Sequence, residues 1–176
     1  MSLLENLQVA YENIDRCLTI ISERNFGIYD YGEDSNLPCK IILNGLNKDV
    51  FRVENNNQIE INFIAIDHCI LDNTGPKKCD CVLFTDSDFS FIEIKMPSSI
   101  KQRSKRKKDA YKQLESTISI FKGSGIFHNV TLNKEAIVCI LGRETYPTRL
   151  SVNFERAKYF MDKYSVDLKI ATIKKY

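Results

Sequence analysis

Apolar residues at the start of the chain recur at the spacing of an amphipathic helix. The stripe consists of Leu3, Leu7, Ile14, Leu18 and Ile21. It predicts a first helix from Leu3 to about Glu23, which Asn25 and Gly27 would end.

A loop at 31–38, marked by glycine and proline, leads into β-rich sequence. Runs of valine, isoleucine and phenylalanine predict extended segments at 39–43, 50–55 and 58–71. The polar run 54–58 is typical of a hairpin turn, so we expect the last two segments to pair.

The second half of the chain alternates between strands and helices. Strands are predicted at 79–85 and 89–95, and the short polar joint between them favours a tight hairpin. A helix from about Lys105 to Phe121 follows, with an apolar stripe of Ala110, Leu114, Ile118 and Phe121. The remaining predicted elements are a strand at 135–141, a helix at 151–164 and a strand at 166–173. This order predicts an α/β sandwich in which a central mixed β-sheet is flanked by helices.

Composition indicates an ordinary globular chain. It has 176 residues, 43% hydrophobic and 27% charged, and we expect one domain over 1–176. No run approaches the ~20 apolar residues that span a bilayer. Residues 1–25 carry acids throughout and lack the basic start and apolar block of a signal peptide. We therefore expect a cytoplasmic protein with no membrane partner.

The cysteines lie among apolar neighbours, with no C-x-x-C spacing. They are Cys17, Cys39, Cys69, Cys79, Cys81 and Cys139. Without an export signal we expect them to be reduced core residues. A zinc site is the alternative, although C-x-C matches the usual ligand spacing poorly. Its ligands would be Cys39, Cys69, Cys79 and Cys81.

The run FSFIEIK at 89–95 places two charges, Glu93 and Lys95, on one face of a strand that is otherwise apolar. Burying a charge costs several kcal/mol unless it is paired or bound to a metal. If the preceding loop has two residues, counting back along the hairpin pairs Asp80 with Glu93. All three side chains then share one face, whereas a loop one residue longer would put Asp80 on the other.

Two carboxylates this close repel each other unless a positive charge lies between them, and hard divalent cations prefer oxygen ligands. Asp80 and Glu93 are therefore candidate ligands for Mg²⁺ or Mn²⁺, with the Ile94 carbonyl as a third oxygen. Lys95 is placed to orient a metal-bound water or to stabilise charge on a phosphate. Such a site suits hydrolysis of phosphodiesters.

These residues resemble the PD-(D/E)XK nuclease superfamily. The likeness lies in GPKKCDCVLF, then FIEIK, then a helix bearing AYKQLESTI. The family pattern is an Asp, a Glu-x-Lys on the next strand and often a Gln on the following helix, here Asp80, Glu93, Lys95 and Gln113. One departure is Cys79 directly before Asp80, with Pro76 further upstream. The resemblance implies a restriction-endonuclease-like fold and a Mg²⁺-dependent nuclease that leaves 5′-phosphate ends.

Helical phase puts Gln113 at the rim of the buried stripe, where it could reach a site at the sheet edge. The resemblance gives it the role of positioning water or substrate. Many members of the superfamily add a further acid. Glu12 in the first predicted helix and Asp67, just upstream of the hairpin, are the candidates.

A basic block follows the catalytic strand on a chain of net charge +2. Its cations are Lys101, Arg103, Lys105, Arg106, Lys107 and Lys108. A local block on a nearly neutral protein indicates a polyanion, and we expect these residues to contact DNA phosphates. A homodimer or a larger complex is compatible with this interpretation.

Two competing functions remain open from the sequence. The same fold could bind nucleic acid or protein without catalysis, which would show as salt-sensitive DNA binding without metal binding. It could also be an effector subunit that cuts only within a larger complex.

Overall fold

The computed structural model describes residues 2–32, 35–71, 74–96, 99–142 and 154–176. These residues form a mixed six-stranded sheet and a four-stranded sheet. In spatial order, the larger sheet contains β1 (Leu18–Ile21), β5 (Ile61–Ala65), β6 (Cys81–Phe84), β7 (Asp88–Lys95), β8 (Asn133–Ile140) and β9 (Asp167–Ile170). The smaller sheet contains β10 (Ile173–Lys175), β4 (Phe51–Glu54), β2 (Asn25–Tyr29) and β3 (Lys40–Ile42).

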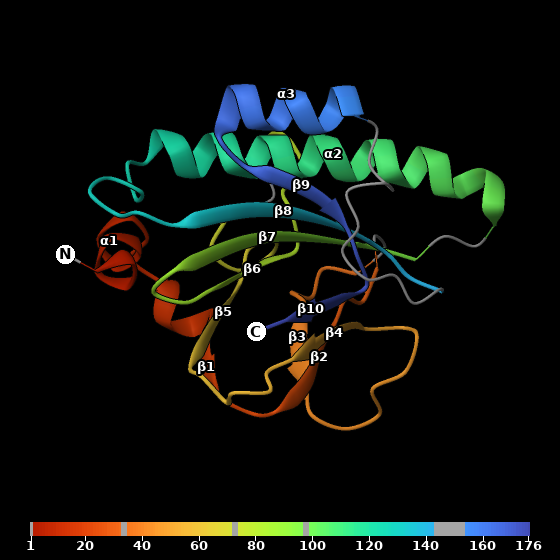
Figure 1. The fold of residues 1–176 in the computed structure, drawn as a ribbon, viewed down its shortest axis with the longest axis horizontal. Coiled ribbons are helices and arrows are strands. Elements are labelled where there is room, and N and C mark those ends of the chain that lie inside the picture. Colours follow the sequence, from red (N-terminus) through yellow and green to blue (C-terminus); the bar gives the residue numbers. More distant parts are fainter. Residues whose placement is uncertain (1, 33–34, 72–73, 97–98, 143–153) are drawn as a thin grey trace.

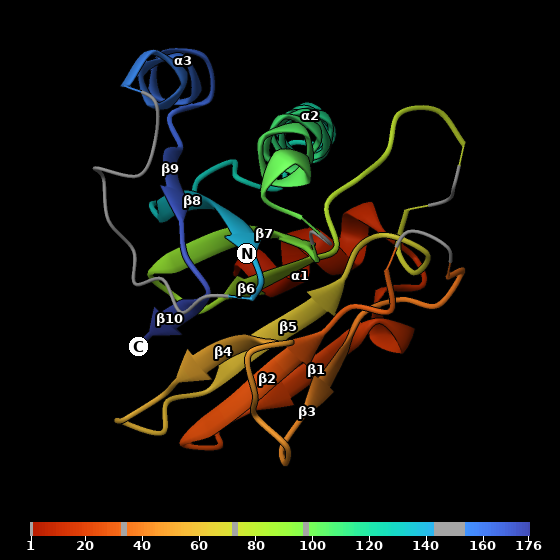
Figure 2. The same cartoon turned by 90° about the vertical axis from the view of Figure 1, so that its right-hand side faces the viewer.

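The helices gather on the larger sheet. They are α1 (Leu3–Ala10), the short 3₁₀ helix η1 (Ile14–Arg16), α2 (Ile100–Gly123) and α3 (Phe154–Tyr164). Figure 1 shows α2 and α3 on one side of the six-stranded sheet, and Figure 2, which looks along α2, shows the four-stranded sheet on the other side. The expectation of an α/β chain with mixed sheet flanked by helices is confirmed. No helix in the described ranges is long and apolar enough to cross a membrane.

Two hydrophobic cores hold these layers together. The core between helices and sheet is rich in aromatic side chains, including Phe89, Phe91 and Phe121. The predicted stripe of α2 is buried in it. The core between the two sheets includes Phe26 and Phe51 from the smaller sheet. Strand β7 contributes to both cores, which explains its nearly continuous apolar sequence.

The prediction of one long first helix was wrong. Helix α1 is capped by Ser2 and Glu5 and ends at Ala10. The β-branched run that follows forms strand β1, in which Leu18 pairs with Ile64 of β5. Pairing with a distant strand overrides the helical spacing of the apolar residues.

Two further predictions were wrong because the chain changes sheets. The run 54–58 is no hairpin turn, since β4 and β5 belong to different sheets. Asn55 makes the corner there, where its side chain bonds both backbone groups of Ile59. The single strand expected at 166–173 is likewise split into β9 and β10. Helix α2 begins at Ile100, earlier than predicted, because Ser99 caps it.

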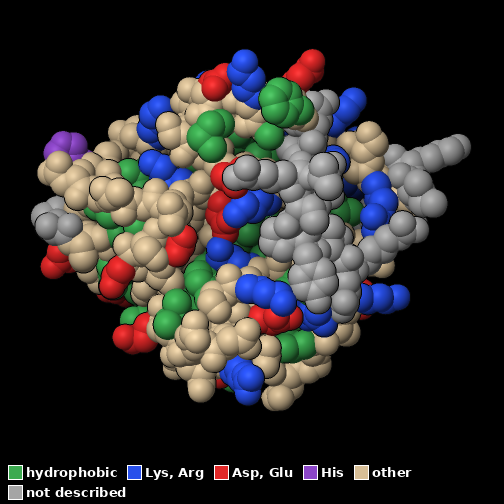
Figure 3. Space-filling view, in the orientation of Figure 1, with side chains coloured by type: hydrophobic (Ala, Val, Ile, Leu, Met, Phe, Trp, Pro, Cys, Tyr) green, Lys and Arg blue, Asp and Glu red, His purple; other side chains and the backbone are tan. Residues whose placement is uncertain are grey.

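A charged cluster fixes β10 at the junction of the sheets. Glu135 of β8 contacts Lys169 and Lys174, and Ser90 Oγ donates to it over 2.7 Å. Burial alone would raise the pKa of Glu135, but the two ammonium groups and the hydroxyl outweigh it and lower the pKa to about 2. Figure 3 shows one face of the molecule, near whose centre acidic and basic side chains lie close together.

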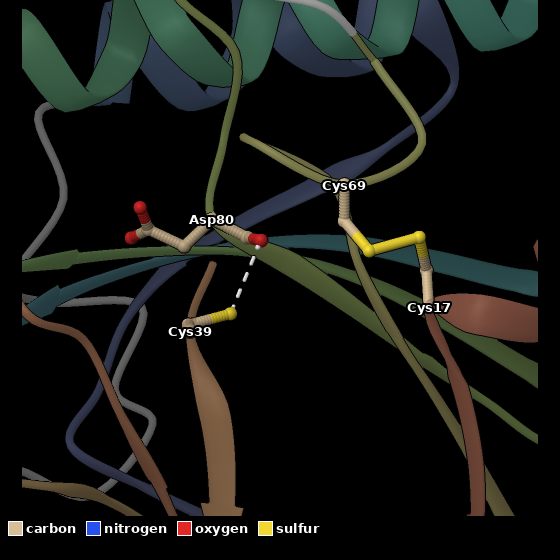
Figure 4. Close-up of a disulfide and its surroundings, with 4 residues drawn as sticks. All are labelled: Cys17, Cys39, Cys69 and Asp80. Carbon is tan, nitrogen blue, oxygen red and sulfur yellow. Dashed lines mark hydrogen bonds between the residues drawn. A yellow bond between two sulfur atoms is a disulfide. The ribbon is translucent and has the colours of Figure 1, made fainter. Parts of the chain in front are cut away.

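A disulfide corrects the expectation that all the cysteines are reduced. Cys17, just before β1, is bonded to Cys69, in the turn after β5, with a Cα–Cα distance of 5.8 Å (Figure 4). The pairing joins residues 52 positions apart, so no local spacing could reveal it. Because Cys69 is used, the four-cysteine zinc set is not available. The free cysteines of the described residues are buried: Cys39, Cys79, Cys81 and Cys139.

Reduction of the disulfide is expected to lower the free energy of unfolding by about 4 kcal/mol, because the bond closes a loop of 52 residues in the unfolded chain. Urea denaturation with and without dithiothreitol measures this difference. In the Cys17→Ala/Cys69→Ala variant, dithiothreitol should change nothing. If dithiothreitol lowers the free energy of unfolding equally in both proteins, the effect does not come from the Cys17–Cys69 bond.

Candidate active site

The hairpin of β6 and β7 has the register of a two-residue loop, as predicted. Cys81 lies opposite Ile92, and one further step along both strands places Asp80 opposite Glu93. Side chains alternate along a strand, so Asp80, Glu93 and Lys95 share a face.

Asp80 lies where β6 leaves β7. In a continued ladder the Ile94 N–H would donate to the backbone at Cys79. It donates instead to Asp80 Oδ2 over 2.6 Å. The Asp80 carbonyl accepts from Ile66 N at 2.8 Å and from Cys39 Sγ at 3.2 Å (Figure 4). The Asp80 side chain is therefore anchored to β7. Its backbone is anchored to the residue after β5 and to the residue before β3.

The Ile94 carbonyl lies on the same side of β7 as Asp80. Leu141 N donates to Lys95 O over 2.9 Å, so the Lys95 peptide groups point toward β8. Successive residues of a strand point their peptide groups to opposite sides, and the Ile94 carbonyl therefore points toward the end of β6. This is the third oxygen expected from the sequence.

Glu93 is fully buried, and Lys95 Nζ lies 2.7 Å from its Oε1. Its Oε2 accepts no hydrogen bond from the described residues. Burial raises the pKa of Glu93 to about 8, although Lys95 opposes the shift. Burial, followed by the charge of Glu93, also raises the pKa of Asp80 well above its ordinary value. The site thus holds more carboxyl groups than one ammonium can neutralise, and without a further cation these carboxyls favour their protonated form.

A pocket of about 270 Å³, here called the carboxylate pocket, lies beside Asp80 and Lys95, while the fully buried Glu93 lies behind its lining. Asp80, Lys95 and Gln113 line it, together with Asp67 and Asp30. Asp30 follows β2 of the smaller sheet and was missed by the sequence analysis, because only the packing of the two sheets brings it here. Burial raises the pKa of Asp30, and its charge in turn raises the pKa of Asp80.

The other predicted residues divide between this pocket and the surface. Gln113 is buried, and its Nε2 donates to Lys78 O over 2.9 Å, so it lies beside the predicted acids as helical phase suggested. Asp67 lines the pocket. Glu12 does not: it is exposed in the turn after α1, because the helix that was to carry it ends earlier.

The basic block lies entirely within α2, where its cations face different directions. Arg103 Nη2 donates to Leu141 O over 2.9 Å, which ties the helix to the end of β8. Lys107 is half-buried, and burial lowers its pKa. Lys108 is exposed, and the side chain of Lys101 lies outside the described part of the chain.

Lys105 and Arg106 line a second pocket of about 610 Å³, here called the basic pocket. Lys77 and Lys112, which the sequence analysis missed, line it too. The basic pocket shares Lys77 and Gln113 with the carboxylate pocket, so the two lie side by side.

No protein-family model, curated protein or solved structure matches this chain. Within the described residues, no group of three or more His, Cys, Asp and Glu side chains could hold a metal ion. A cation at this site would need backbone oxygen and water as well as carboxylates. The unpartnered Glu93 Oε2, the Asp80 carboxylate and the Ile94 carbonyl fit a hard cation of this kind.

The raised pKa of Glu93 predicts a pH-dependent stability. The unfolded chain ionises this group from about pH 4.5, and the folded protein only near about 8. The free energy of unfolding should therefore fall as the pH rises from about 4.5 to about 8, by on the order of 5 kcal/mol. Urea titrations in metal-free buffer across this range should show a shallower slope for Glu93→Gln than for wild type. The exposed Glu12→Gln is the control, and equal slopes in all three proteins would contradict the assignment.

Proposed function

We propose that this chain is a divalent-metal-dependent nuclease of the PD-(D/E)XK type, with a restriction-endonuclease-like fold, that hydrolyses phosphodiester bonds of DNA. The observation that carries the proposal is the junction at the end of the β6–β7 hairpin. There Asp80 Oδ2 accepts a hydrogen bond from the Ile94 N–H over 2.6 Å. Glu93 and Lys95 lie on either side of Ile94 in strand β7. The adjoining basic pocket supports a polyanionic substrate.

Asp80, Glu93 and the Ile94 carbonyl would hold Mg²⁺ or Mn²⁺. When bound, such an ion neutralises the carboxylates, lowers the pKa of a coordinated water and polarises the phosphate. Lys95 would orient the attacking water. Its ammonium group would also stabilise the negative charge that develops on the phosphate oxygens. Gln113, fixed through Lys78, would position water or substrate.

In the reaction, the water oxygen forms a bond to phosphorus as the bond from phosphorus to the 3′ oxygen breaks. The attacking water releases its proton to solvent, and the leaving oxygen takes up a proton from solvent and ends as a 3′ hydroxyl. The other product carries a 5′-phosphate. The buried carboxylates stay in place throughout, because the surrounding strands fix them.

Metal binding provides the first test. Mg²⁺ or Mn²⁺ at a hundred times its Kd should stabilise the wild-type protein by about 2.7 kcal/mol, seen as a rise in Tm. Asp80→Asn should lose most of this rise, because the substitution removes a ligand charge. Asp86→Asn, in the exposed hairpin loop, is the matched control. An equal rise in Asp80→Asn and Asp86→Asn would argue against this metal site.

Cleavage provides the second test. Purified protein is incubated with plasmid and with linear single- and double-stranded DNA, in Mg²⁺, Mn²⁺ or EDTA. Glu93→Gln and Lys95→Met should each lower the metal-dependent rate by about a hundredfold or more, while Glu12→Gln should not. Circular dichroism checks that each variant is folded. A Glu93→Gln rate equal to wild type would contradict the proposal. Metal binding without cleavage of any substrate would instead favour an effector that needs a partner.

A further inference from the structure

A third pocket, of about 440 Å³, adjoins the carboxylate pocket on the side away from α2. It shares Asp30 and Gly32 with that pocket. Tyr29 and Tyr31 line it, and Ile94 of β7 forms part of its wall. We call it the tyrosine pocket.

The tyrosine pocket offers two aromatic rings for stacking, and its charged lining residues are the acids Asp30 and Asp49. The cations line the basic pocket instead. The Tyr29 and Tyr31 rings lie edge to face with centroids 5.2 Å apart. Lys40 Nζ lies 5.1 Å from the centroid of the Tyr31 ring. Proteins that bind single strands combine a basic groove, which tracks the phosphates, with aromatic rings on which bases stack.

The three pockets follow one another across the molecule. The basic pocket meets the carboxylate pocket at Lys77 and Gln113, and the carboxylate pocket meets the tyrosine pocket at Asp30 and Gly32. The acids lie deep in the middle: Glu93 is fully buried. Bases in a duplex are stacked and paired inward, so they could not enter a pocket beside such a site. An unpaired strand can present its phosphates to the cations and a base to the tyrosines.

We infer that these pockets form one groove for an unpaired DNA strand. Backbone phosphates lie over the basic pocket, the phosphate to be cleaved lies at the carboxylate pocket, and a neighbouring base stacks in the tyrosine pocket. The place of the cleaved phosphate rests on the proposed nuclease function. The choice of a single strand over a duplex rests on the aromatic rings of the tyrosine pocket and on its place beside the carboxylate pocket.

Fluorescence anisotropy tests the groove separately from cleavage. The probe is a labelled single-stranded oligodeoxynucleotide of about 12 nucleotides, compared with the blunt duplex of the same sequence. Binding is measured in Mg²⁺ with Glu93→Gln protein, so that the probe stays intact. The single strand should bind at least about tenfold more tightly than the duplex. Adding Tyr31→Leu should weaken single-strand binding by about tenfold, whereas Tyr31→Phe should not.

Tyr159→Leu is the matched control, because Tyr159 lies on α3 and is 37% exposed, as Tyr31 is. Equal affinity for duplex and single strand would overturn the inference, as would equal effects of Tyr31→Leu and Tyr159→Leu. The nuclease proposal fails in a different way. Wild-type protein that binds single strands through Tyr31 and yet cleaves no substrate would support the binding groove and contradict the nuclease proposal.

Discussion

The hydrogen bond from Ile94 N to Asp80 Oδ2, 2.6 Å long, is the contact on which the site depends. It replaces one rung of the β6–β7 ladder, so β6 can turn away while β7 continues and pairs with β8. The Asp80 carboxylate accepts the hydrogen bond that a backbone carbonyl would accept in a regular sheet. The same bond fixes this carboxylate beside the strand that carries Glu93 and Lys95.

This arrangement brings several carboxyl groups close together, which is unfavourable unless a positive charge lies among them. Asp30 and Asp67 face the same pocket as Asp80 and Lys95, and their charges add to that of Glu93. Burial raises the pKa of Glu93 to about 8 against the opposing effect of Lys95, and the charges of Asp30 and Asp67 add to the rise. Groups perturbed in this way gather at functional sites, where a ligand supplies the missing charge. A divalent cation is the ligand whose chemistry matches these oxygens.

The surrounding structure holds this cluster of carboxyl groups in place. Strand β7 is anchored on both faces, by the aromatic core under α2 and by the core between the sheets. The disulfide fixes Cys69, two residues after Asp67, to the start of β1. Asn55 and the Glu135 cluster secure two of the three places where the chain crosses between the two sheets. The last of these crossings leads into β10, which pairs with β4 and completes the sheet from which Asp30 projects.

The sequence alone determined the parts of the site that depend on local periodicity. Alternation along β7 put Glu93 and Lys95 on one face, and helical phase placed Gln113 at the rim of α2. The pairing of Asp80 with Glu93 depended on a two-residue loop, and the structure has that loop. Only the tertiary structure brought in Asp30, Lys77, Lys112 and the Cys17–Cys69 bond. It also turned the end of the expected first helix into β1 and split the last strand between two sheets. Those features depend on contacts between segments far apart in the chain, which neither spacing nor periodicity encodes.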